Sequence, residues 1–141
     1  MTKIIQNPGS YRDPAGSVYN YNGRIIRTVK NYGLKRYEYI KNNNILDSSI
    51  KNNFLIKTKE VNELKKEPEF SDAHHVLEHE IVPYVSYPYE WGFYQLKTAA
   101  LHHLKFQIFL LEKNSVLIDA SAYNIQFIGN KPIFIDVLSI D

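Results

Sequence analysis

Two short stretches near the beginning of the chain combine β-branched residues and tyrosines with polar residues. Residues 17–21 and 24–29 flank the dipeptide Asn22-Gly23, and both of its residues tolerate the positive φ angles of a type I′ turn. The pattern therefore predicts a β-hairpin. Apolar residues at every third position then predict a short helix over about 34–43. A second short helix is expected at 47–51, before a strand-like segment at 54–56.

The second half of the chain shows one long helical pattern between strand patterns. Residues 80–87 predict an edge strand, because Pro83 lacks a backbone donor. Residues 93–113 contain neither proline nor glycine, and their apolar positions recur every three or four residues, which predicts a long helix. Leu101, Phe109 and Leu110 broaden its apolar face, so we expect it to lie largely inside the domain. The repeating positions are Phe93, Leu96, Ala100, Leu104, Ile108 and Leu111. Residues 125–128 and 133–135, joined by a Gly-Asn turn, predict a second hairpin.

These elements, in the order strands, helices, strands, predict an α+β fold in a single module over residues 1–141. Within it, 7–56 contains the first hairpin and the short helices. Residues 57–72 are rich in charge and poor in apolar groups, so we expect a linker-like stretch. Residues 73–141 contain the edge strand, the long helix, a loop and the second hairpin.

The composition excludes several classes of protein. The chain has no cysteine, which removes disulfides, thiol nucleophiles and cysteine-based metal sites. Its net charge is only +2, so we expect no nucleic-acid partner, because such binding needs a clustered basic face. The longest fully apolar run is residues 108–111, far below the roughly 20 residues of a membrane span. With no signal-peptide pattern at the N-terminus, we expect a soluble, cytoplasmic chain.

Three polar residues near the C-terminus form a chemically informative pattern. Asp119 and Asn124 lie in the loop after the long helix, and Asp136 follows the second hairpin. This order is typical of kinase-type phosphoryl transfer, in which a loop carboxylate orients or deprotonates a hydroxyl and two further oxygen ligands bind Mg²⁺. The alternative is structural: the same side chains cap turns by accepting bonds from nearby backbone N–H groups.

Histidines suggest a different function. His75 and His79 are spaced to share one face of a helix beside Glu78 and Glu80, which is the spacing of a zinc-binding pair. The competing interpretation is a solvated histidine cluster. A zinc-binding domain therefore stays an alternative function.

Several blocks of sequence resemble one family. They are residues 10–16, 86–91, 95–101, 119–124 with 126–127, and 135–139. Together they are similar to the N-terminal region of certain bacterial SAM-dependent methyltransferases, including nodulation-associated ones. In that family the region resembles a protein kinase or aminoglycoside-phosphotransferase lobe, and a Rossmann-type methyltransferase domain follows it. The resemblance implies a kinase-like lobe that ends prematurely at residue 141, with the methyltransferase domain absent.

The resemblance also implies roles for individual residues. Asp119 would be the catalytic base or orienting group, and Asn124 and Asp136 would bind Mg²⁺ for ATP. Residues 84–91 resemble the hinge that contacts adenine, which makes Tyr87 and Glu90 candidate cofactor-binding residues; Glu90 is also expected to cap the following helix.

The chain departs from the kinase pattern in its phosphate-binding half. No histidine precedes Asp119 by two residues, no Val-Ala-x-Lys strand is present, and the first hairpin has too few glycines for a phosphate-covering loop. Lys30 is the nearest strand-end lysine and the candidate for the phosphate-binding position. A glycine loop for SAM is also missing, so SAM is expected only through the absent domain.

These observations predict a substrate- or domain-positioning pseudo-enzyme module with a vestigial or working Mg-nucleotide site. Its expected partners are a nucleotide or small molecule and the C-terminal methyltransferase domain of a longer protein. The alternative is a small-molecule phosphotransferase using Mg-ATP. An interrupted lobe would also expose the apolar face of its long helix around Leu104 and Ile108, so we expect self-association.

Overall fold

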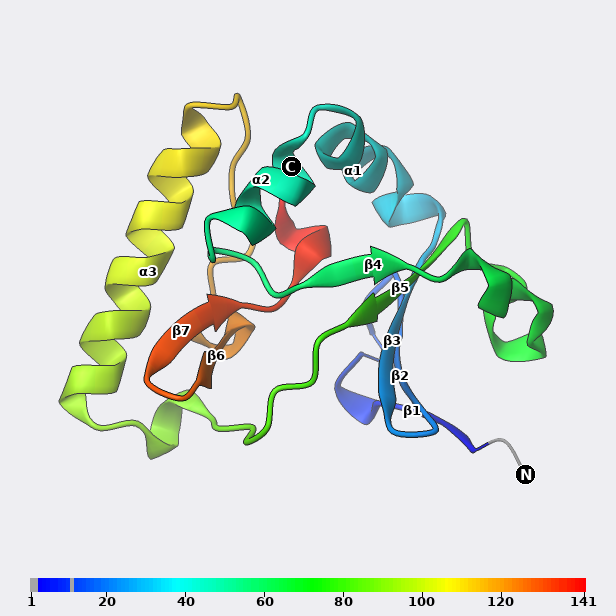
Figure 1. Ribbon diagram of the computed structural model, residues 1–141, viewed down its shortest axis with the longest axis horizontal. Helices are drawn as coiled ribbons and strands as arrows, with labels where there is room; N and C mark the ends of the chain where they lie inside the picture. The colour runs from blue at the N-terminus through cyan, green and yellow to red at the C-terminus, as the bar shows by residue number, and fades with distance from the viewer. Residues whose placement is uncertain (1–2, 11) are drawn as a thin grey trace. The chain divides into compact units, whose positions relative to one another are not determined.

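The computed structural model describes residues 3–10 and 12–141 (Figure 1). Tyr11, which belongs to the first block of family resemblance, lies outside the described residues. The chain forms two compact units: unit 1 comprises Met1–Glu38 and Lys57–Ile81, and unit 2 comprises Tyr39–Ile56 and Val82–Asp141. Helices and strands occur in both halves of the chain, which confirms the α+β class.

Unit 1 is built on a five-stranded antiparallel sheet in the order β1-β2-β3-β5-β4. The strands are β1 (Ile4–Gln6), β2 (Val18–Tyr21), β3 (Arg24–Val29), β4 (Thr58–Glu60) and β5 (His75–His79). β2 and β3 form the predicted hairpin, with Tyr21 paired to Arg24. The turn residues Asn22 and Gly23 have φ angles of 51° and 82°, as this tight turn requires.

The stretch 57–72 is not a linker. It contains β4 and two 3₁₀ turns, Asn62–Lys66 and Pro68–Phe70. Its few apolar side chains, Val61, Leu64 and Phe70, are all buried in the core of unit 1, where the Phe70 ring packs edge-on against Tyr19 at 5.1 Å between centroids. The low apolar content of this stretch did not prevent it from packing, because each of these three apolar side chains is buried in the core.

The strand predicted at 80–87 does not form. The chain instead uses His75–His79 as β5, which pairs with β3 on one side and β4 on the other. A strand with two neighbours needs its backbone N–H groups for both ladders, and Pro83 has none to offer. The sheet therefore takes the proline-free segment before it.

Two helices follow β3. α1 (Asn31–Asn42) begins in unit 1 and ends in unit 2, and α2 (Ile45–Lys51) belongs to unit 2. Both overlap the short helices expected from the sequence. Asn44 separates them in the left-handed conformation with φ of 57°, which asparagine tolerates better than most residues.

The rest of unit 2 contains α3 (Phe93–Leu111) and the antiparallel hairpin of β6 (Ile125–Ile128) and β7 (Lys131–Phe134). Both elements were predicted. Phe106 of α3 lies at their junction, stacked on Phe54 at 5.2 Å and edge-on to Phe134 at 5.6 Å between ring centroids. Among the described residues, none of the helices is long and apolar enough to cross a membrane.

The buried face of α3 is not the face that the sequence pattern selected. The helix buries Ala99, His102, Phe106 and Leu110. The predicted positions Ala100, Leu104, Ile108 and Leu111 are exposed. α3 is apolar on both sides, so periodicity alone did not determine which side packs on the hairpin. The separate expectation that Leu104 and Ile108 stay exposed is confirmed.

Candidate functional site

The second hairpin brings Asn124 and Asp136 to the same end of two adjacent strands. Asn124 directly precedes β6, and its carbonyl oxygen accepts a hydrogen bond from the Ile135 N–H at 2.9 Å. Asp136 is the next residue after Ile135. The side-chain nitrogen of Asn124 donates to the carbonyl oxygen of Asp119 at 3.1 Å. Asn124 is therefore hydrogen-bonded to the Asp119 loop on one side and to the strand leading into Asp136 on the other.

The two carboxylates are held by short local turns. Asp119 is exposed, and its Oδ1 accepts the Ser121 N–H at 3.0 Å. Asp136 is half-buried; its Oδ1 accepts the Leu138 N–H at 3.3 Å and its Oδ2 accepts the Ser139 hydroxyl. The turn-capping role considered from the sequence is thus present. Each carboxylate oxygen can accept about two hydrogen bonds, so turn capping and ligand binding by one carboxylate are compatible.

The orientation of the Asn124 amide matters for metal chemistry. With its nitrogen donating to the Asp119 carbonyl, the amide oxygen is the acceptor end of the side chain, and amide and carboxylate oxygens are the ligands that hard cations prefer. Mg²⁺ typically takes one or two protein carboxylates and completes its octahedron with waters and phosphate oxygens. Within residues 3–10 and 12–141, no group of three or more histidine, aspartate or glutamate side chains is close enough to hold a metal ion.

His103 was not among the candidate site residues, yet it lies near this loop. Burial lowers the pKa of its imidazole, the neighbouring His102 lowers it further, and the charge of Asp119 opposes the shift. Its ring packs edge-on against Phe134 at 5.7 Å between centroids. The position of His103 on α3 gave no signal for these two interactions. Phe134 and Asp119 are distant from His103 in the sequence and come close to it only in the folded chain.

Tyr87 and Glu90 lie together, in a different local role from the one expected. The Glu90 carboxylate accepts the backbone N–H of Tyr87 at 3.1 Å and so closes the 3₁₀ turn Pro88–Glu90. It does not cap α3, whose first turn is closed by Gln95 accepting the Gly92 N–H at 3.4 Å. The Tyr87 ring stacks parallel to Tyr89 at 5.6 Å.

Lys30 lies in unit 1, directly after β3. Its ammonium pairs with Asp72 at 2.8 Å, and that hydrogen bond raises the pKa of Lys30 above its ordinary value. A second basic residue of this region, Arg27, is buried and pairs with Asp13 at 2.6 Å. The basic groups of β3 and its end therefore make ion pairs within unit 1.

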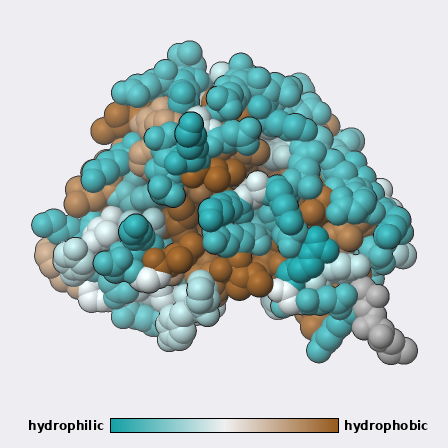
Figure 2. Space-filling model, in the orientation of Figure 1, coloured by the Kyte–Doolittle hydropathy of each residue, from teal (hydrophilic) through white to brown (hydrophobic). Residues whose placement is uncertain are grey.

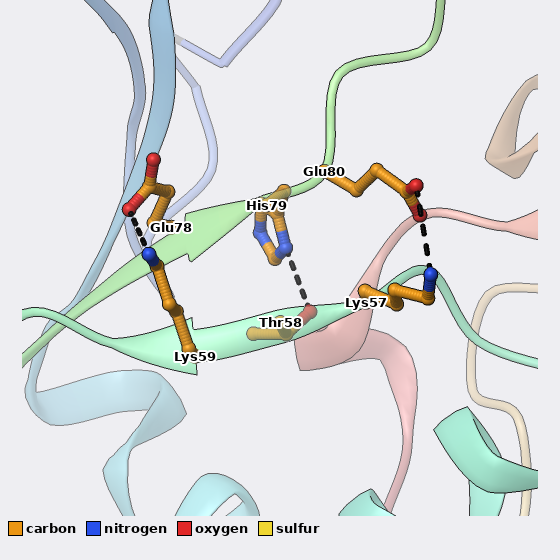
Figure 3. A pocket seen from close by; sticks show the side chains of 6 residues that line it. All are labelled: Lys57, Thr58, Lys59, Glu78, His79 and Glu80. Carbon is orange, nitrogen blue, oxygen red and sulfur yellow. Dashed lines mark hydrogen bonds and ion pairs between the residues drawn. The ribbon is translucent and has the colours of Figure 1, made fainter.

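A shallow cavity of about 260 Å³ lies in unit 1 between β4 and β5 (Figure 3). Its lining consists of Lys57, Thr58, Lys59, Glu78, His79 and Glu80. These form three cross-strand pairs, of which Lys59 with Glu78 is the tighter ion pair at 3.1 Å. A bidentate bond from Arg24, together with Lys59, lowers the pKa of Glu78 to about 2. The polar groups of this cavity are thus largely paired with one another.

The helical zinc pair expected from His75 and His79 does not form, because both residues lie on β5. Four residues along a strand separate the two Cα atoms by about 13 Å. His79 bonds to the Thr58 hydroxyl at 2.8 Å, and His75 lies 3.4 Å from Glu60. The four-residue spacing of His75 and His79 suits zinc binding only on a helix, and here both residues lie on a strand.

No family model matches the sequence. The chain is 36% identical over 132 residues to the nodulation protein NoeA of Rhizobium meliloti (strain 1021). The match covers 94% of this chain and 27% of NoeA. The chain thus spans about a quarter of the length of this relative and is similar to one region of a longer nodulation protein.

Proposed function

We propose that this chain is a kinase-like module of a larger protein, which positions a substrate or a neighbouring domain and retains a Mg-nucleotide site at Asn124 and Asp136. The observation that carries the proposal is the pair of hydrogen bonds made by Asn124, one to the Asp119 carbonyl and one from the Ile135 N–H. They connect Asn124 to the backbone of the Asp119 loop and to the strand that leads into Asp136, which supports a shared site for these three residues.

The order of elements supports the same proposal. After β3 come α1 and α2, then β4 and β5, then the long helix α3, a loop with Asp119 and Asn124, the β6–β7 hairpin and Asp136. Kinase-type phosphotransferases place the helix after a strand, the base and the amide ligand in a loop, and the metal-binding aspartate further along the chain. The match is one of order and residue type, and it adds to the family resemblance of the sequence.

The residues have separate roles in this proposal. Asn124 and Asp136 provide oxygen ligands for Mg²⁺, which when bound neutralises phosphate charge. The exposed Asp119 accepts a hydrogen bond from a substrate hydroxyl and orients it. Tyr87 and Glu90 contribute through the segment that resembles the adenine hinge.

The residues expected to bind phosphate favour a role in positioning a substrate or domain over a role in phosphoryl transfer. In kinases the strand lysine contacts the phosphates and pairs with a helix glutamate. Here Lys30 pairs with Asp72, a residue between the 3₁₀ turn Pro68–Phe70 and β5, and no other cation is assigned to the phosphates. SAM chemistry belongs, in this proposal, to the remainder of a longer protein.

Calorimetric titration with ATP, in the presence and absence of Mg²⁺, tests the nucleotide site. We expect Mg²⁺-dependent binding that weakens at least about tenfold in Asp136→Asn, because one anionic ligand is lost. Asparagine can still accept the Leu138 N–H, so the turn is retained. Asp47→Asn, which removes an exposed carboxylate from α2 of the same unit, is the matched control. Absence of ATP binding by the folded chain would contradict the nucleotide site.

A second candidate function is small-molecule phosphotransfer with Mg-ATP. The exposure of Asp119 favours it, because a hydroxyl-bearing substrate can reach the carboxylate. ATP consumption is measured with hydroxyl-bearing acceptors, comparing the wild type with Asp119→Asn. Turnover that is lost in the variant while ATP binding persists would support this function. Binding without turnover in the wild type would leave the positioning function.

A further inference from the structure

α3 has an unpaired apolar seam on the side opposite its buried face. Four large side chains of the seam are exposed: Leu101 by 44%, Leu104 by 61%, Ile108 by 57% and Leu111 by 56%. Figure 2 shows hydrophobic residues at the molecular surface along this helix. Single exposed leucines need no explanation, but four in register along one helix form a contiguous patch.

The seam has the spacing of a helix-to-helix contact. Its members are separated by three, four and three residues, the alternation of a heptad repeat with a mean of 3.5 residues. At about 100° per residue, the four side chains fall within an arc of about 80°. The buried residues Ala99, His102, Phe106 and Leu110 cluster on the opposite side of the helix.

The partner that fits this seam is another helix with the same repeat. Of the helices in the described residues, α2 is only seven residues long and α1 exposes tyrosines, not an aliphatic row. α3 is thus the one helix of the described chain that can match the seam. We propose that α3 pairs with α3 of a second copy of this chain, in an antiparallel arrangement about a two-fold axis. This goes beyond the proposed nucleotide site and does not depend on it.

Charges at the two ends of the seam select the antiparallel direction. The seam is centred between Leu104 and Ile108, with Lys97 before it and Glu112 after it, both exposed. In an antiparallel pair centred there, Lys97 of one copy lies within about one helical turn of Glu112 of the other, twice by symmetry. A parallel pair would instead bring Lys97 beside Lys97 and Glu112 beside Glu112. Lys105 flanks the seam and can turn its ammonium to solvent.

Sedimentation equilibrium of the full chain from low to high micromolar concentration tests the pairing. We expect a reversible dimer, with twice the monomer mass at the upper end. Leu104→Glu with Ile108→Glu puts carboxylates in the centre of the seam and should raise the dimer dissociation constant at least about a hundredfold. Leu96→Glu, at an exposed apolar position outside the seam, is the matched control and should leave the dimer intact. Far-UV circular dichroism confirms that the variants are folded.

Charge reversal tests the direction. Lys97→Glu and Glu112→Lys should each weaken the dimer several-fold by bringing like charges together, and the double variant should restore it. A monomer at every concentration would overturn the proposal and assign the seam to a different chain. Open-ended aggregation, or equal weakening by Leu96→Glu, would overturn it as well. A dimer in which the double variant is not restored would overturn the antiparallel direction.

Discussion

The two units satisfy their polar groups in different ways. In unit 1, charged side chains on neighbouring strands pair with each other, as in the group of Arg24, Lys59 and Glu78. In unit 2, the carboxylates of Asp119 and Asp136 accept backbone N–H groups of their own turns. A carboxylate that faces a cation is stabilised mainly by charge pairing, whereas one that accepts N–H groups of its own turn also fixes the local backbone. The comparison shows that the charges of unit 1 join strands to one another, while the two carboxylates of unit 2 hold the turns in which the proposed site lies.

Core truncation gives the largest expected effect and tests whether the units are separate. Phe106 in unit 2 and Phe70 in unit 1 are both fully buried, so Phe106→Ala and Phe70→Ala should each lower the free energy of unfolding by about 3–5 kcal/mol. Hydrogen exchange should show the greatest loss of protection among amides of the unit that carries the substitution. Equal loss in both units would instead show one cooperative unit.

A buried amide in unit 2 should give the next largest effect. The Gln126 side chain accepts the Ser86 N–H at 3.0 Å and donates to the Ser86 carbonyl at 2.9 Å, and both residues are buried. Gln126→Leu leaves both backbone groups unsatisfied and should cost about 2 kcal/mol or more in urea denaturation. Ser86→Ala keeps these two bonds and loses only the one from the Trp91 indole, so its cost should be smaller. A larger cost for Ser86→Ala would contradict this account.

Mild acid should destabilise unit 2 through His102. Burial lowers the pKa of this imidazole below its ordinary value of 6.5, and its Nε2 lies 2.9 Å from the Phe54 carbonyl oxygen. Because the unfolded chain takes up the proton first, stability is complete above pH 6.5 and is lost as the pH falls toward the folded pKa. Urea unfolding followed by fluorescence of Trp91, the single tryptophan, measures this loss. His102→Gln should flatten the profile, and an unchanged profile would contradict the assignment.

Stronger acid should act on unit 1, with the smallest effect. The pKa of Glu78 is lowered from 4.5 to about 2, mainly by the bond from Arg24. Its contribution is present above pH 4.5 and is lost as the pH falls from there toward 2. At neutral pH, Glu78→Gln should cost less than about 1 kcal/mol, and it should remove part of the acid dependence of hydrogen exchange in unit 1. The exposed Glu69→Gln is the control and should change neither.

Local residue chemistry determined much of the fold and the placement of the candidate residues. Asn22-Gly23 set the first hairpin, a run without proline or glycine set α3, and the second hairpin placed Asn124 beside the strand that leads to Asp136. These features depend on neighbours within a few residues, or on a short turn that joins two strands. Such information is contained in the order of residues, so it can be read without knowledge of the rest of the chain.

The tertiary structure alone decided which of several suitable segments and faces were used. It placed His75–His79 in the sheet in preference to 80–87, and it packed Phe70 from a charged stretch into a core. It also turned the Ala99–Phe106 face of α3 inward and left Leu104 exposed. The physical reason is that apolar periodicity specifies that a face can be buried, while burial itself depends on which distant groups fill the space against it. For α3, that group was the ring of Phe134 against Phe106.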